Sequence, residues 1–184
     1  MTRSLLSRIG RRLTRLWRDE NGTSTMEFVL VVPAIMLIFT GAFEAGMLEI
    51  RYVMLDRSLD IAVRELRLGQ IPNPTHDKLK AEICKRAALI PDCLNSVMLE
   101  LRPVDTTTWT GIDTSASCID RSEDINTQKP PNFNAGGDDQ LMLVRACAVM
   151  DPIFPTTSLG LAMKKDATGA YHLVATSAFV NEPS

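Results

Sequence analysis

A run of uncharged, mostly apolar residues, 28–43, lies near the start of this 184-residue chain, between Glu27 and Glu44. As an α-helix the run would rise only about 24 Å, which is short of a hydrocarbon core of about 30 Å. Adding residues 23–26 reaches a spanning length, but the span then contains Glu27. A carboxylate at that depth costs on the order of 2.5–3.5 kcal/mol, and such residues usually have a function. The run therefore predicts a membrane helix with one functional acid.

A basic leader precedes this helix. Residues 1–22 hold six arginines against Asp19 and Glu20, whereas the rest of the chain is acidic. Arginines at this density can contact the phosphates of a nucleic acid. A basic flank directly before an apolar run more often sets membrane orientation, with the basic side in the cytoplasm. We therefore expect a cytoplasmic leader, a single membrane pass, an extracytoplasmic head and no nucleic-acid partner.

Beyond the run, apolar residues recur every three or four positions, which indicates an amphipathic helix that continues the membrane helix. Gly69 is a natural C-cap, and the prolines after it forbid continuation. Residues 23–70 are thus predicted to form one helix of about 70 Å. Whether its apolar stripe packs on the protein's own head or also on neighbouring subunits stays open. The stripe consists of Leu48, Tyr52, Leu55, Leu59, Ala62 and Leu66.

Residues 71–184 are predicted to form a small extracytoplasmic head. A second helix is expected over residues 75–90, ended by Pro91. Three strands should follow: residues 97–102 with one wet face, 141–150 apolar throughout and therefore central, and 171–180, which alternates less cleanly. The expected fold class is α+β, with a three-stranded antiparallel sheet packed on both helices. The domains are a leader (1–22), a long helix (23–70) and the head.

Four cysteines fit an oxidising exterior, and they allow three disulfide connectivities. We favour a short loop closed by one pair and a second pair that ties a long polar loop to a strand; four buried thiols are the alternative. The favoured pairs are Cys84–Cys93 and Cys118–Cys147.

His76 and His172 are isolated and no C-x-x-C pair occurs, so neither a metal nor a cofactor is expected. Common catalytic motifs do not occur either, and we expect no enzyme.

The junction between leader and helix has its own chemistry. A cut between Gly22 and Thr23 would create an α-amino group, which is largely cationic at neutral pH. Glu27 lies four residues on, one helical turn away. In a bilayer, pairing this amine with this carboxylate, within one subunit or between neighbours, lowers the cost of burying both charges.

The motif Gly22-x-x-x-x-Glu27-Phe28, followed by an apolar helix, resembles the processing signature of type IV pilin-like proteins. The Phe after the acid is similar to the Flp/Tad (tight adherence) pilus system, and the wider stretch from Asn21 to Gly46 resembles its TadE-like family. This resemblance implies a pilin-like fold and a minor pilin or pseudopilin of the bacterial inner membrane, acting in pilus assembly or initiation. A prepilin peptidase of the TadV type would cleave after Gly22, making Thr23 the mature N-terminus.

The resemblance further implies that Glu27 and Phe28 act in assembly and recognition, and that the partners are other Tad pilins and the inner-membrane pilus machinery. Three other interpretations stay open. An ordinary signal peptidase could release a secreted protein near Ala42 or Ala45. The chain could be an uncleaved single-pass protein with an extracytoplasmic binding or sensor head. It could also be a tethered periplasmic enzyme.

Overall fold

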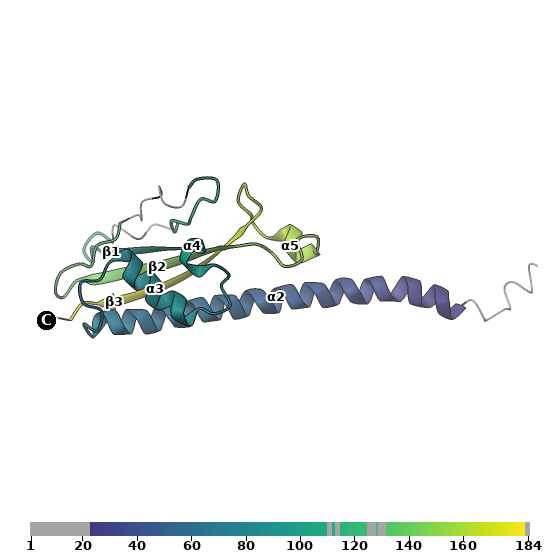
Figure 1. The fold of residues 1–184 in the computed structure, drawn as a ribbon, viewed down its shortest axis with the longest axis horizontal. Helices are drawn as coiled ribbons and strands as arrows, with labels where there is room; N and C mark the ends of the chain where they lie inside the picture. Colours follow the sequence, from purple (N-terminus) through teal and green to yellow (C-terminus); the bar gives the residue numbers. More distant parts are fainter. Residues whose placement is uncertain (1–22, 110–111, 113–114, 125–127, 129–131, 183–184) are drawn as a thin grey trace, which may run out of the picture. The chain divides into compact units, whose positions relative to one another are not determined.

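The computed structural model describes residues 23–109, 112, 115–124, 128 and 132–182. The chain divides into two compact units, which meet between Ala42 and Phe43. Within the described part of the first unit there is only helix, the beginning of α2. The second unit contains the rest of α2 and an α+β head with a three-stranded sheet, which confirms the predicted fold class (Figure 1).

Helix α2 runs unbroken from Thr23 to Arg67, 45 residues with Pro33 inside. Its C-terminus has the hydrogen bonds of a Schellman motif. The Gln70 N–H donates to the Glu65 carbonyl at 2.9 Å, and the Gly69 N–H donates to the Leu66 carbonyl at 3.1 Å. Gly69 has φ +67°, a left-handed conformation that favours glycine. The predicted helix and its cap are therefore confirmed.

Two shorter helices follow, α3 (His76–Arg86) and α4 (Cys93–Ser96). Thr75 caps α3 by accepting a hydrogen bond from the Lys78 N–H at 3.4 Å. The second helix exists as expected, but the predicted end at residue 90 is wrong. The backbone leaves the helical region at Ala87, whose ψ is 55°. A tight turn then joins the Ile90 N–H to the Ala87 carbonyl at 3.0 Å, and both side chains stay in the core.

The sheet has the order β1-β2-β3, all antiparallel: β1 (Val97–Pro103), β2 (Leu141–Met150) and β3 (Tyr171–Val180). In the register, Ala146 of β2 lies between Leu99 of β1 and Ala175 of β3. The apolar strand β2 is central and buried on both faces, as its composition predicted. A further helix, α5 (Ser158–Ala162), lies in the connection between β2 and β3 and was not predicted.

β3 alternates almost strictly between buried and exposed residues, more cleanly than the residue types in its sequence do. One expectation about the strands is wrong. The second face of β1 is not wet, since Met98 is 6% and Glu100 5% exposed. Part of the long stretch between β1 and β2 covers this face, where Ile119 joins Met98, Cys147 and Val149 in a second apolar cluster.

The main core lies between the sheet, the second half of α2 and α3. Leu55, Leu59 and Ala62 of the predicted stripe are fully buried against the protein's own head. Tyr52 does not belong to this stripe, because it is 39% exposed. Arg51 takes its place and donates a hydrogen bond to the Tyr171 hydroxyl at 2.9 Å. The packing face of α2 therefore contains a buried cation, Arg51, which the spacing of apolar residues did not predict.

Candidate functional site

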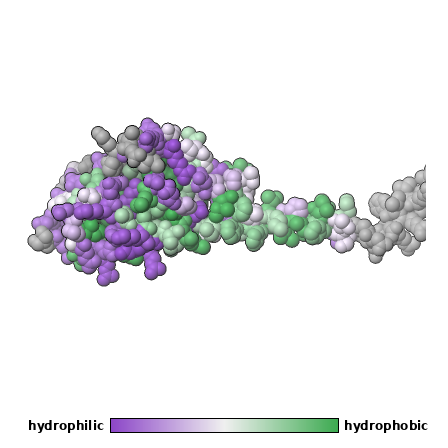
Figure 2. All heavy atoms as spheres, viewed as in Figure 1, coloured by the Kyte–Doolittle hydropathy of each residue, from purple (hydrophilic) through white to green (hydrophobic). Residues whose placement is uncertain are grey.

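The candidate site is the first half of α2 together with the polar groups at its two ends. From Ser24 on, almost every apolar side chain of this segment is exposed, on all sides of the helix: Leu30 is 72% and Ile38 74% exposed. An 18-residue window within Ser24–Arg67 has a mean hydropathy of 2.2, and none of it is buried within the protein. Figure 2 shows these side chains in green, in contrast to the mostly purple surface of the head. A helix that is apolar all round requires an apolar environment outside the chain.

Glu27 lies in the second turn of this helix and is exposed. Gly22 lies outside the described residues. Thr23 is the first described residue and is helical, so Thr23 and Glu27 are one turn apart as expected. Phe28, next to the acid, is 66% exposed. Within the part of the chain that the structure describes, Glu27 has no ion pair. Its carboxylate therefore depends on a partner from elsewhere if the helix enters a bilayer.

Glu44 lies at the other end of the apolar run. Unlike the exposed Glu27, it is buried and only 1% exposed. Its two carboxylate oxygens accept hydrogen bonds from the backbone N–H groups of Ile153 at 3.0 Å and Phe154 at 2.7 Å. The ring of Phe43 meets that of Phe154 edge to face, with 6.0 Å between the centroids. We call this arrangement the Glu44 clip. It fastens the connection between β2 and β3 to α2.

Sequence reasoning missed the Glu44 clip and treated Glu44 only as the end of the apolar run. The sequence did offer one indication that Glu44 has a role. It directly follows the uncharged run, within a helix that was predicted to continue past it. That signal does not identify the partners, because Ile153 and Phe154 lie about 110 residues further on in the sequence.

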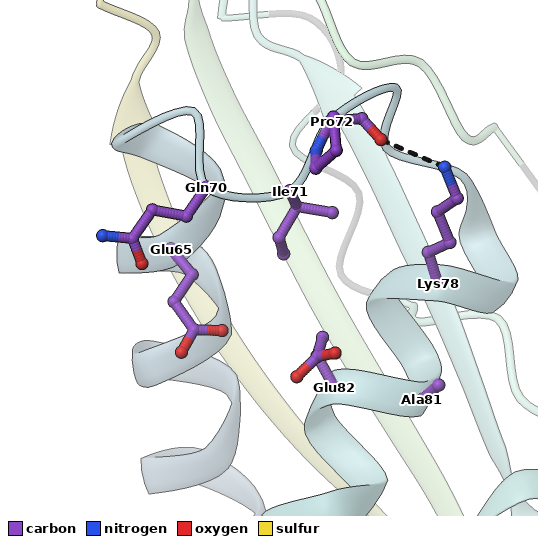
Figure 3. Close-up of a pocket in the computed structure, with 7 residues that line it drawn as sticks. All are labelled: Glu65, Gln70, Ile71, Pro72, Lys78, Ala81 and Glu82. Atoms are coloured by element: carbon purple, nitrogen blue, oxygen red, sulfur yellow. Dashed lines mark hydrogen bonds between the residues drawn. The ribbon is translucent and has the colours of Figure 1, made fainter.

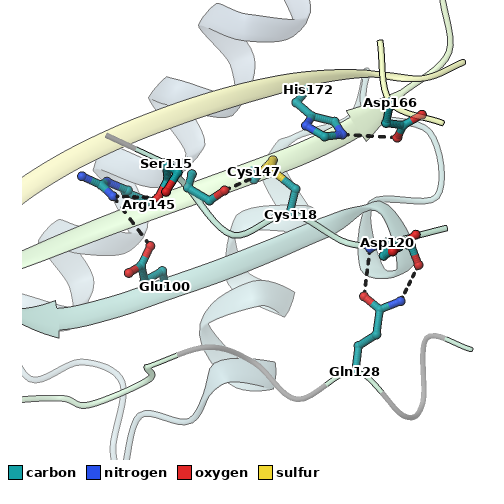
Figure 4. The surroundings of a disulfide bond; sticks show 10 residues. Glu100, Ser115, Cys118, Asp120, Gln128, Arg145, Cys147, Asp166 and His172 are labelled. Atoms are coloured by element: carbon teal, nitrogen blue, oxygen red, sulfur yellow. Dashed lines mark hydrogen bonds and ion pairs between the residues drawn. A yellow bond between two sulfur atoms is a disulfide. The ribbon is translucent and has the colours of Figure 1, made fainter. Parts of the chain in front are cut away.

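All four cysteines are paired, in the connectivity that the sequence favoured. Cys84–Cys93 joins α3 to α4. Cys118–Cys147 attaches the long stretch between β1 and β2 to the central strand (Figure 4). His172 lies next to this second disulfide, with a ring nitrogen within 4.8 Å of both sulfurs. Disulfide sulfurs are not thiolates, so this group does not offer the ligands of a zinc site.

Two turns beside the same disulfide are each held by an aspartate, Asp166 or Asp120, whose carboxylate accepts hydrogen bonds from the residues that follow it. Burial on its own would raise the pKa of Asp166, but hydrogen bonds from the Thr168 hydroxyl, the Ala170 N–H and His172 bring that pKa down to about 2. The Ser122 hydroxyl and N–H likewise hold the pKa of Asp120 below its ordinary value. These carboxylates are satisfied within their own turns and serve to order them.

Hollows lie on the surface of the head. One of about 460 Å³ lies between the end of α2 and α3 (Figure 3). There the Lys78 ammonium donates to the Pro72 carbonyl at 3.0 Å, and Glu65 and Glu82 both pair with Arg86. The full lining of this hollow is Glu65, Gln70, Ile71, Pro72, Lys78, Ala81 and Glu82. Another hollow, of about 340 Å³, lies beside the Cys118–Cys147 disulfide, and Ser122, Thr168 and His172 are among the residues that line it. The Ser122 hydroxyl donates to Asp120 at 2.6 Å and the Thr168 hydroxyl to Asp166 at 2.7 Å, so neither hydroxyl donates to the His172 ring.

Comparison with known proteins identifies the region that contains this site. The family model described as TadE-like protein matches residues 22–65. Neither a curated protein nor a solved structure matches the chain. The matched stretch begins at Gly22, contains Glu27 and Glu44, and ends two residues before α2 does. Residues 22–65 of this chain are therefore a TadE-like region, as the junction motif indicated.

Proposed function

We propose that this protein is a minor pilin or pseudopilin of the Tad (Flp) pilus. The TadE-like region indicates a protein associated with that pilus, and the long apolar helix is compatible with a single-pass membrane protein. The leader lies in the cytoplasm, α2 crosses the inner membrane and the head lies outside, where its two disulfides are stable. The head binds partners and has no catalytic role.

Processing after Gly22 is the first step of the proposed function. A prepilin peptidase of the TadV type cuts between Gly22 and Thr23. All the described residues of α2, from Thr23 to Arg67, remain in the chain after this cut. The family match also begins at Gly22, which supports a processing site at this junction. The new amine then lies one turn from Glu27.

The contrast between Glu27 and Glu44 carries the proposal. Both acids flank the same apolar run, but only Glu44 is satisfied within the described part of the chain. Glu27 is exposed among apolar side chains. In a bilayer an unpaired carboxylate costs on the order of 2.5–3.5 kcal/mol. The amine of a neighbouring processed pilin offsets this cost, which draws subunits into register.

The test is Glu27→Ala in cells, with pili counted by electron microscopy and membrane insertion measured by fractionation. We expect a folded, inserted protein and loss of pili. Glu49→Ala is the matched control, since Glu49 is an exposed acid on the same helix beyond the apolar run. Normal piliation of Glu27→Ala would refute the assembly role of this acid, as would an equal loss of pili in both variants.

A further inference from the structure

We propose that residues 152–163 form a second membrane contact, which rests on the lipid surface at the point where α2 leaves the bilayer. This inference depends on the proposed insertion of α2. It adds an interaction surface on the head. The motif at residues 22–28 gives no information about this surface. The surface consists of the loop before α5 and α5 itself, and we call it the α5 platform.

The Glu44 clip determines where the α5 platform lies. Phe43 is the last residue of the uncharged run, and Glu44 is the first charged residue after it. The hydrogen bonds from Ile153 and Phe154 to Glu44 hold the platform beside these two residues. Figure 1 shows α5 at the end of the head opposite to the last turn of α2. If residues 28–43 cross a bilayer, the platform is therefore at the height of the headgroups.

Close packing and hydrogen bonds hold the α5 platform in a conformation that leaves two of its apolar side chains exposed to solvent. Gly160 packs so closely that an added Cβ would lie 2.4 Å from the Phe154 carbonyl oxygen. The Thr157 hydroxyl accepts the Gly160 N–H at 3.1 Å and donates to the same Phe154 carbonyl at 2.9 Å. Held in this way, α5 leaves Leu161 71% exposed, and Ile153 of the loop is 37% exposed. In the proposal, these outward apolar side chains are the part of the platform that enters the lipid.

The charge pattern indicates which occupant covers this surface. Residues 152–163 contain no charged side chain, and Lys164 and Lys165 follow directly. Asp151, on the other flank, is paired with Arg121 at 2.8 Å. Apolar residues followed directly by lysines suit a membrane–water interface, where the apolar groups enter the acyl boundary and the ammonium groups reach the lipid phosphates. Phe154 of the platform also contacts Phe43, the last residue of the uncharged run, which points to lipid rather than to a second copy of the chain.

The experiment places a single indole at three positions of the full chain and measures its quenching by lipids with brominated acyl chains. The background is Trp17→Phe and Trp109→Phe, which removes both native tryptophans. Leu161→Trp reports on the α5 platform and Phe39→Trp on insertion of α2. Val180→Trp is the matched control, since Val180 is 48% exposed at the opposite end of β3. The protein is reconstituted in vesicles of phosphatidylcholine and phosphatidylglycerol.

We expect bromine to quench the indole in Leu161→Trp and Phe39→Trp but not in Val180→Trp, with a blue-shifted emission in the first two. Quenching in Phe39→Trp alone would overturn the platform and leave the membrane helix intact. No quenching in Phe39→Trp would refute the proposed insertion itself. An unquenched emission in Leu161→Trp that shifts to the blue as the protein-to-lipid ratio rises would mean that a second copy covers the surface, which also overturns the proposal. Intact disulfides in all three variants, checked by mass, show that the fold is retained.

Discussion

Removal of the Glu44 carboxylate is predicted to release the α5 platform from α2 while the sheet stays folded. In Glu44→Ala the backbone N–H groups of Ile153 and Phe154 lose their acceptor. The edge-to-face contact between Phe43 and Phe154 is then the remaining described link of the clip. The core residues of the sheet pack with α3 and the second half of α2, and of the platform only Met163 is packed against this cluster, so we expect the core to keep its packing.

The expected cost follows from the two hydrogen bonds. An N–H left without an acceptor costs about 1–3 kcal/mol, and two such groups cost about twice as much. The variant also relieves the burial of a carboxylate, which opposes this loss. We therefore expect the platform to open more easily by about 2 kcal/mol. Since about 1.4 kcal/mol corresponds to a factor of ten, the open state should be populated about 30-fold more.

Amide hydrogen exchange followed by mass spectrometry measures this opening directly. The informative amides are those that keep their acceptors in the variant. The Leu161 N–H bonds to the Thr157 carbonyl at 2.9 Å, and the Met163 N–H bonds to the Leu159 carbonyl at 3.0 Å. A peptide that covers residues 152–163 should exchange about 30-fold faster in Glu44→Ala, while peptides from β2 stay protected.

Glu49→Ala provides the control, because it removes an exposed acid from the same helix and should leave the exchange unchanged. An unchanged exchange rate of the platform peptide in Glu44→Ala would refute the clip. Faster exchange in β2 as well would show that Glu44 supports the whole head and not only the platform.

Two other predictions concern the stability of the head. Cys118–Cys147 joins residues 29 positions apart and Cys84–Cys93 residues 9 apart, so the double alanine variants should lose about 3.6 and about 2.6 kcal/mol in denaturant titrations; the reverse order would contradict the chain-entropy reasoning. The pKa of Asp166 is lowered to about 2 from its ordinary 3.8, so its contribution is present above pH 3.8 and is lost as the pH falls toward 2. Asp166→Asn should therefore lose less stability than the parent protein over this range, and equal acid sensitivity of the two would exclude this role.

The secondary structure followed from the sequence where one physical signal dominated. Helix α2 was predictable because its apolar spacing persists up to Gly69, whose left-handed conformation ends it. The central position of β2 was predictable because its composition is apolar on both faces. The burial of the second face of β1 was harder to predict. The irregular stretch that contains Ile119 covers Met98, and a stretch without periodicity does not indicate where it packs.

The polar groups inside the head could not be predicted for a related reason. Spacing tells which face of a helix a residue occupies but not what crosses that face. Arg51 lies on the packing face of α2 because the Tyr171 hydroxyl, 120 residues away in sequence, accepts its hydrogen bond. Glu44 is buried because two distant backbone N–H groups converge on it. Of the junction, the motif predicted the family match, while Gly22 lies outside the described residues and its cleavage stays a prediction.

The mature N-terminus tests the central claim most directly. The protein is purified from the membranes of cells that make the pilus, and its first residue is determined by mass spectrometry of the intact chain and of its N-terminal peptide. The proposed function predicts a chain that begins at Thr23, and a Gly22→Val variant that keeps its leader. A native chain that retains the arginine-rich leader, or one that begins beyond residue 42, would contradict it, because the amine proposed to pair with Glu27 would then not exist.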